Sequence, residues 1–125
     1  MLVDNVSALT RPDRPRGCLS IQGGLSCGPA NSAIADFLAA SRLGGEEALA
    51  VRLARAVDEG DLPAGSDPSA LARFVMTFAD GQAVHAAAGV EHDQLLQSAQ
   101  IALSVFADAA TRYPTQHPAS GVSRT

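Results

Sequence analysis

The sequence predicts an all-α protein, a single helical bundle, from three observations. Its 125 residues are 46% hydrophobic but only 4% aromatic, with no Trp, so the apolar content lies mainly in small side chains that favour helices. Apolar residues recur at helical spacing in several stretches that end at Gly or Pro. No stretch alternates apolar and polar residues as a half-buried strand would.

Five helices are expected, and local signals set their ends. They cover, in order, about residues 1–10, 17–27, 31–60, 67–88 and 92–110. Asp67-Pro68 supplies an N-cap and a first-turn proline for the fourth helix. The fifth helix has a poorly capped start, where Asp93 in the first turn is the only favourable feature. Gly23 and Gly24 in the second helix indicate that a neighbouring backbone comes close.

The last two predicted helices carry more apolar surface than one small domain can cover. On the final helix, apolar and small residues occupy about two-thirds of the circumference, and the preceding helix has a similarly broad face. We therefore expect these helices to pair with the same two helices of a second copy, as a four-helix dimer bundle. The residues expected at this homodimer interface are Met76, Leu95, Ser98, Ile101, Ala102 and Val105.

Composition and charge exclude several classes of function. With nine basic and thirteen acidic residues the net charge is −4, so no direct nucleic-acid contact by this chain is expected. No apolar run reaches the roughly 20 residues of a membrane span, and the N-terminus lacks a signal layout, so we expect a cytoplasmic protein. Cys18 and Cys27 point to opposite sides of a helix and are expected to be free thiols. The helical domain is expected over residues 1–112, followed by a disordered tail over residues 113–125.

No catalytic, metal or cofactor site is predicted. Residues 24–28 fit the G-x-S-x-G pattern of hydrolases, but that motif needs a strand before the Ser, and here it falls at a helix end. His85, His92 and His117 show no metal-ligand spacing. Because no nucleophile, base and orienting group can be assembled, we expect that the chain is not an enzyme.

Several local motifs resemble the C-terminal regulatory domain of TetR-family transcriptional regulators, over about residues 10 to 108. They are Asp13-Arg14-Pro15-Arg16-Gly17-Cys18-Leu19, Glu59-Gly60-Asp61-Leu62-Pro63, Asp67-Pro68-Ser69-Ala70-Leu71-Ala72-Arg73-Phe74 and Gly81-Gln82-Ala83-Val84. The resemblance implies a repressor whose final two helices form the dimer and whose preceding helices enclose a pocket for a small, often apolar effector. The family's helix-turn-helix head does not appear in this sequence, so DNA binding would need a head that this chain lacks. Glu91 is a second departure, where relatives tend to have a capping Ser or Thr.

The candidate effector-binding residues fall on three of the predicted helices. They are Cys18, Gln22, Phe37, Phe74, Phe78, Gln82 and His85. For Gln82 and His85, the alternative is a hydrogen-bonded position in the core or the dimer seam. For Cys18, Gln22 and the Phe residues, the alternative is plain core packing.

Asp80 and Arg73 lie together on the less apolar side of their helix and are interpreted as a solvated pair or an interface contact. The alternative function is a stand-alone helical homodimer that binds a small apolar molecule or a protein and has no role at DNA.

Overall fold

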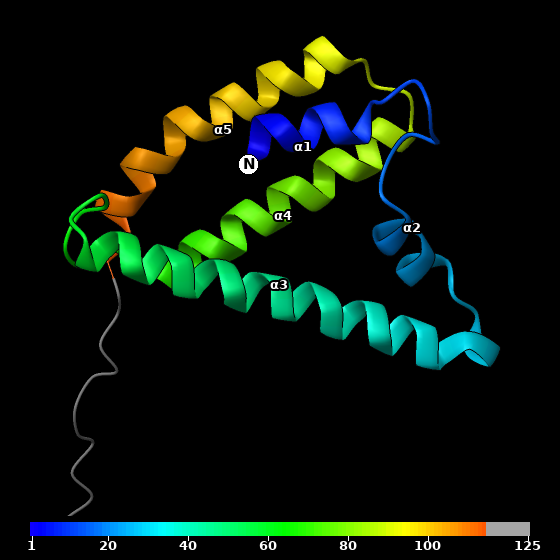
Figure 1. The fold of residues 1–125 in the computed structure, drawn as a ribbon, viewed down its shortest axis with the longest axis horizontal. Helices are drawn as coiled ribbons and strands as arrows, with labels where there is room; N and C mark the ends of the chain where they lie inside the picture. Colours follow the sequence, from blue (N-terminus) through cyan, green and yellow to red (C-terminus); the bar gives the residue numbers. More distant parts are fainter. Residues whose placement is uncertain (115–125) are drawn as a thin grey trace, which may run out of the picture.

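The computed structural model describes residues 1–114, whose secondary-structure elements are five α-helices and a short 3-10 turn, and this confirms the predicted fold class. The elements are α1 (Leu2–Leu9), α2 (Leu19–Ser26), the 3-10 turn η1 (Pro29–Asn31), α3 (Ser32–Asp58), α4 (Pro68–Ala87) and α5 (His92–Arg112). In Figure 1, α4 crosses the middle of the molecule, α3 runs below it, and α1 and α5 lie above it. Of the predicted tail, residues 115–125 lie outside the described part of the chain.

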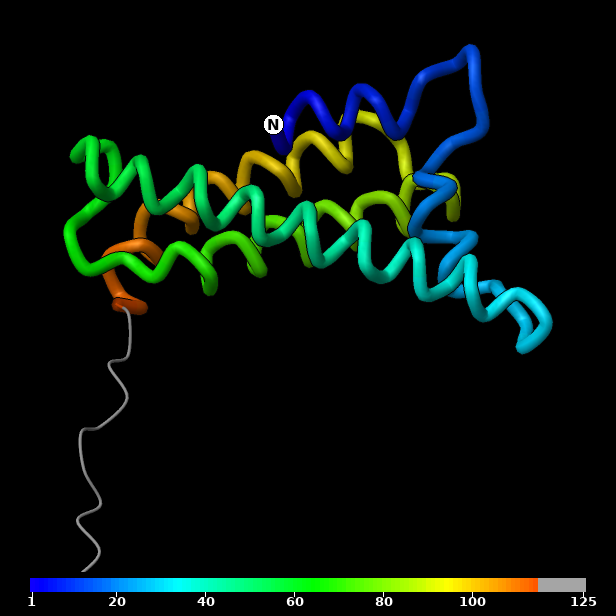
Figure 2. Tube along the Cα trace, turned by 60° about the horizontal axis from the view of Figure 1, so that its bottom comes forward, coloured from blue at the N-terminus to red at the C-terminus, as the bar shows by residue number. Residues whose placement is uncertain are grey.

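The core forms where α1 packs against both α4 and α5 (Figure 2). Leu2, Val6 and Leu9 lie on one face of α1, three or four residues apart, and all three are buried. Small residues on α4 and α5 let the backbones of these two helices approach closely. The buried members of α4 and α5 in this cluster include Val75, Ala83, Ala86, Leu95, Ala99 and Ala102.

Side-chain caps fix the starts of α4 and α5. Asp67 Oδ1 accepts hydrogen bonds from the backbone N–H groups of Ser69 and Ala70, each at 3.0 Å, which confirms the predicted cap. At the start of α5, the Gln94 side chain accepts a hydrogen bond from the backbone N–H of Glu91 at 3.3 Å. The prediction of a poorly capped start was therefore wrong, because Glu91 and Gln94 together make a capping box.

Glycines mark two close approaches in the fold. Gly17 has a φ of +94°, and a Cβ there would lie 2.9 Å from the Cβ of Ala87 on α4. A Cβ on Gly23 or Gly24 of α2 would lie 3.6 or 3.5 Å from the Leu38 side chain of α3. The predicted close approach at these two glycines is thus made by side chains of α3 rather than by its backbone.

The first half of α3 extends beyond α4 and packs against α2 (Figures 1 and 2). The helix is unbroken through Gly44 and Gly45. Ile34 and Phe37, which belong to the apolar stripe of this helix, are 52% and 71% exposed. Among residues 1–114, no helix is long and apolar enough to span a membrane.

Candidate functional site

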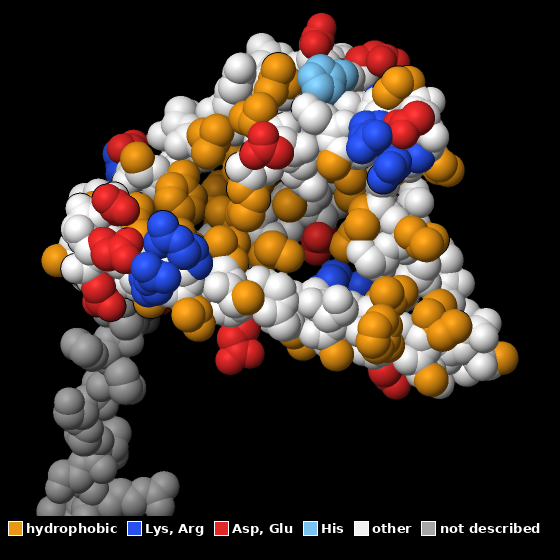
Figure 3. Space-filling model, viewed as in Figure 1, with side chains coloured by type: hydrophobic (Ala, Val, Ile, Leu, Met, Phe, Trp, Pro, Cys, Tyr) orange, Lys and Arg blue, Asp and Glu red, His pale blue; other side chains and the backbone are white. Residues whose placement is uncertain are grey.

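A cavity of about 340 Å³ lies between α1, α2, α3 and α4. Figure 3, viewed as Figure 1, shows a hollow in the surface with hydrophobic side chains around it and acidic and basic side chains beside it. Most of the cavity wall is apolar, and its members come from helices far apart in the sequence. They include Leu2, Leu9, Ile21, Met76, Ala79 and Ala83.

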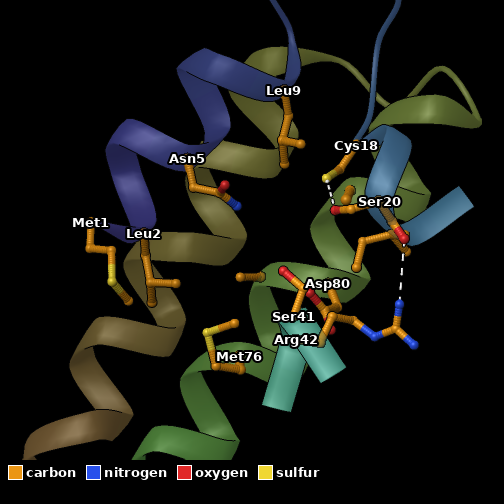
Figure 4. Close-up of a pocket in the computed structure, with 13 residues that line it drawn as sticks. Met1, Leu2, Asn5, Leu9, Cys18, Ser20, Ser41, Arg42, Met76 and Asp80 are labelled. Atoms are coloured by element: carbon orange, nitrogen blue, oxygen red, sulfur yellow. Dashed lines mark hydrogen bonds between the residues drawn. The ribbon is translucent and has the colours of Figure 1, made fainter. Parts of the chain in front are cut away.

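All four helices contribute polar side chains to the cavity wall, namely Asn5, Ser20, Ser41, Arg42 and Asp80 (Figure 4). Arg42 on α3 donates a hydrogen bond from Nη1 to the backbone carbonyl of Ser20, at 3.4 Å. Asp80 on α4 makes no hydrogen bond or ion pair with any residue in the described part of the chain. Burial raises the pKa of the Asp80 carboxyl above its ordinary value, and the nearby positive charge of Arg42 opposes this only in part.

The polar part of the wall also borders a second hollow, of about 200 Å³, between α2 and α4. Ile21, Arg42 and Asp80 line both this hollow and the cavity. A group bound beside Asp80 would therefore lie between the apolar interior and the outer surface.

Of the seven predicted effector-binding residues, only Cys18, at the start of α2, lines this cavity in the described part of the chain. Its Sγ lies 2.9 Å from the hydroxyl oxygen of Ser20. Burial raises the pKa of the Cys18 thiol, but hydrogen bonds from the Ser20 side chain and nearby backbone outweigh this and hold the pKa below its ordinary value. Gln22, predicted to share the buried face, is exposed and does not line the cavity. It lines an adjoining surface hollow that shares Asn5, Leu9 and Cys18 with the cavity.

On the other side of α4, two adjoining hollows of about 430 and 280 Å³ follow the seam between α4 and α5. We call this surface the α4–α5 groove; Phe78 and Ser98 line both of its halves. Four predicted effector-binding residues lie here rather than at the cavity: Phe74, Phe78, Gln82 and His85. Ile101 and Val105, which also line the groove, are 60% and 48% exposed.

Gln82 lies at the bottom of the groove and is only 4% exposed. Its Nε2 donates a hydrogen bond to the backbone carbonyl of Leu95 at 3.0 Å, which ties α4 to α5. Its Oε1 is buried and has no hydrogen-bond partner in the described part of the chain. His85, one turn further along α4, is exposed. Gln82 therefore has a structural role within the chain, whereas His85 is free to contact another molecule.

The structure also separates the predicted dimer residues. Ser98, Ile101 and Val105 line the groove, and Leu95 and Ala102 form its buried floor. Met76 lies on the opposite side of α4, in the wall of the cavity, so its prediction as an interface residue is not supported by its position. Phe37 lines neither the cavity nor the groove.

Asp80 and Arg42 are the site residues that sequence reasoning missed. The sequence predicts that Asp80 and Arg73 lie together. In the structure, Arg73 instead contacts Glu46 of α3, with Nε and Nη2 at 3.0 and 2.8 Å from Oε1. That interpretation of Asp80 and Arg73 was wrong. The missed signal was the helical spacing, since Asp80 follows Met76 by four residues and precedes Ala83 by three, on one face of α4.

The helical fold that holds α4 between the cavity and the groove is similar to that of part of a transcriptional regulator. The family described as the tetracyclin repressor-like C-terminal domain matches residues 1–103. The chain belongs to this family, as the sequence motifs predicted. No curated protein sequence matches the chain.

Two solved structures are similar to this chain, both of cysteine mutants of the TetR family transcriptional regulator CifR in complex with 26-base-pair operator DNA. One is 33% identical in sequence, with a TM-score of 0.78, and the match covers 82% of this chain and 54% of that one. The other is 32% identical, with the same TM-score and the same coverage. The chain thus spans about half the length of the regulators that it resembles.

Proposed function

We propose that this chain is the effector-binding and dimerisation domain of a TetR-like repressor that responds to a small, largely apolar effector. The observation that carries the proposal is the position of α4 between the cavity and the α4–α5 groove. Met76 and Asp80 face the cavity, whereas Phe78 and His85 face the groove. A molecule bound in the cavity would therefore contact the same helix that carries the outer apolar face.

The effector cavity is supported by its size, its apolar wall and its few polar groups. A volume of about 340 Å³ falls in the range of small-molecule sites, which are lined mainly by apolar side chains with a few polar groups that orient the ligand. Asp80, Arg42, Cys18 and Asn5 are among those polar groups here. The proposed role is regulatory and non-enzymatic.

The homodimer is supported by the exposed apolar side chains along the α4–α5 groove. Ile101 and Val105 would lose contact with water if a second copy were to pack there, and this burial is favourable. The proposed interface comprises Phe74, Phe78, His85, Ser98, Ile101 and Val105. The DNA contacts seen for the similar regulators are assigned, in this proposal, to a head outside this chain.

Binding of a neutral fluorescent probe, N-phenyl-1-naphthylamine, tests the effector cavity. The wild-type chain is expected to bind the probe, and Ala79→Leu is expected to weaken binding about tenfold or more, because the larger side chain fills the cavity. Ala107→Leu, at an exposed position on α5, is the matched control and should bind as the wild type does. Equal binding by all three proteins would reject the cavity as the site.

The stand-alone homodimer remains the second candidate, and the same cavity and groove would serve it. The two functions differ in what the effector does. Joined to the helix-turn-helix head of a TetR-family regulator, this domain is expected to release operator DNA when the probe fills the cavity. Operator binding that is unaffected by a bound probe would favour the stand-alone function.

A further inference from the structure

We propose that the effector is a small cationic amphiphile, an apolar chain or ring with one protonated amine that the Asp80 carboxylate binds. This inference rests on the proposed function, because it names the class of ligand for the same cavity. In the cavity wall, Asp80 is an ionisable group with no hydrogen-bond or ion-pair partner among residues 1–114.

Asp80 lacks the partners that usually accompany a carboxylate removed from water. It makes no hydrogen bond and no ion pair within residues 1–114, and it lies among apolar side chains such as Ile21 and Ala83. A carboxylate in such surroundings loses hydration, and an ammonium group within hydrogen-bond reach would offset that loss. The ligand would thus supply the partner that the fold does not.

The second charged group of the cavity wall does not provide an equivalent site for an anion. The Arg42 guanidinium is held towards α2 by its hydrogen bond to the Ser20 carbonyl, as Figure 4 shows. An anionic group in the cavity would approach the Asp80 carboxylate, and the two like charges would repel each other. The Asp80 carboxylate attracts a cation there, and the positive charge of Arg42, at longer range, opposes that attraction only in part.

The amphiphilic character follows from where Asp80 lies. Asp80 borders both the apolar cavity and the outer hollow between α2 and α4, so an ammonium beside it keeps part of its hydration. A fully buried ammonium would lose all of it at a much larger cost. The rest of the ligand would extend along the wall formed by Leu2, Leu9 and Met76.

Calorimetric titration with octylamine, 1-octanol and octanoate isolates the contribution of the head group, because the three share one apolar chain. At neutral pH the wild-type chain is expected to bind octylamine about tenfold or more tightly than octanol, since a charge-assisted hydrogen bond is about twice as strong as a neutral one. Octanoate should bind most weakly. Asp80→Asn should abolish the preference for the amine and leave octanol binding unchanged. Asp36→Asn, which removes the same charge from an exposed position on α3, should keep the preference.

The outcomes separate this inference from the proposed function. If octanol binds the wild type as well as octylamine does, or if the amine preference survives in Asp80→Asn, the inference is overturned while the effector cavity stands. If none of the three molecules binds, the inference is also overturned. In that case the naphthylamine titration decides whether the cavity itself is rejected.

Discussion

Asp80 and Arg42 face the same cavity from α4 and α3 without forming an ion pair. The Arg42 guanidinium donates instead to the Ser20 carbonyl at 3.4 Å, and Asp80 is left with only the longer-range attraction of that charge. The fold therefore contains a half-buried carboxylate that does not stabilise it, in the wall of the cavity to which we assign the effector.

The first prediction concerns the stability of Asp80→Asn. Burial raises the pKa of Asp80 above its ordinary value, so the folded state favours the protonated carboxyl. Its contribution to stability is present below the ordinary value of 3.8 and is lost as the pH rises through the raised pKa. At neutral pH, Asp80→Asn should unfold at a higher urea concentration than the wild type, and below the ordinary pKa this gain should vanish. A lower urea midpoint at neutral pH would show that Asp80 stabilises the fold.

The second prediction compares two glycines. Gly17→Ala should destabilise the chain by about 1–3 kcal/mol, because the residue has a φ of +94° and its new Cβ would lie 2.9 Å from that of Ala87. Gly44→Ala, inside α3 with no atom within 4 Å of a new Cβ, should stabilise it by about 1 kcal/mol. Urea denaturation measures both changes. Equal effects of the two substitutions would contradict the close contact at Gly17.

The third prediction tests the groove as a dimer interface. Ile101→Glu should convert a dimer into a monomer, because a second copy would bury this 60% exposed side chain. Leu103→Glu is the control, since Leu103 is 47% exposed on the same helix but does not line the groove. Sedimentation equilibrium gives the mass of each variant. A monomeric wild type, or loss of the dimer in Leu103→Glu alone, would contradict the proposed interface.

The fourth prediction separates Gln82 from its neighbour on the groove. Gln82→Ala should lower the free energy of unfolding by about 1–3 kcal/mol, because it removes the hydrogen bond to Leu95 and leaves a buried gap. His85→Ala should leave the stability of the monomer unchanged and weaken the dimer, since His85 is exposed on the groove. The free energy of unfolding is measured by urea denaturation of the monomeric Ile101→Glu variant, alone and combined with Gln82→Ala or with His85→Ala. Similar losses for both would mean that His85 also has a structural role.

Most signals that act within one or two turns could be predicted from the sequence. Asp67 with Pro68 starts α4 because the cap and the proline act on neighbouring backbone groups. The apolar faces of α4 and α5 were also recognised, since their spacing is a local property. The cap of α5 is harder to predict, because it uses Glu91 in place of a Ser or Thr and depends on the Gln94 side chain three residues later.

Which helix covers which face could not be read from periodicity. Met76 and Phe78 belong to one broad apolar arc, but α3 and α1 cover only part of it, so the two residues lie on opposite sides of α4. Phe37 has the spacing of a core residue, yet it lies on the part of α3 that extends past α4. The sequence alone indicates a surface charge at Asp80. Only the positions of α1 and α2 show that Asp80 lines the cavity.

Native mass spectrometry of the chain with N-phenyl-1-naphthylamine tests the central claim most directly, because it counts chains and bound molecules together. If each chain has its own cavity and the groove joins two copies, the predominant ion should contain two chains and two probe molecules. Single chains, or a dimer that holds one probe molecule between its two copies, would contradict the account.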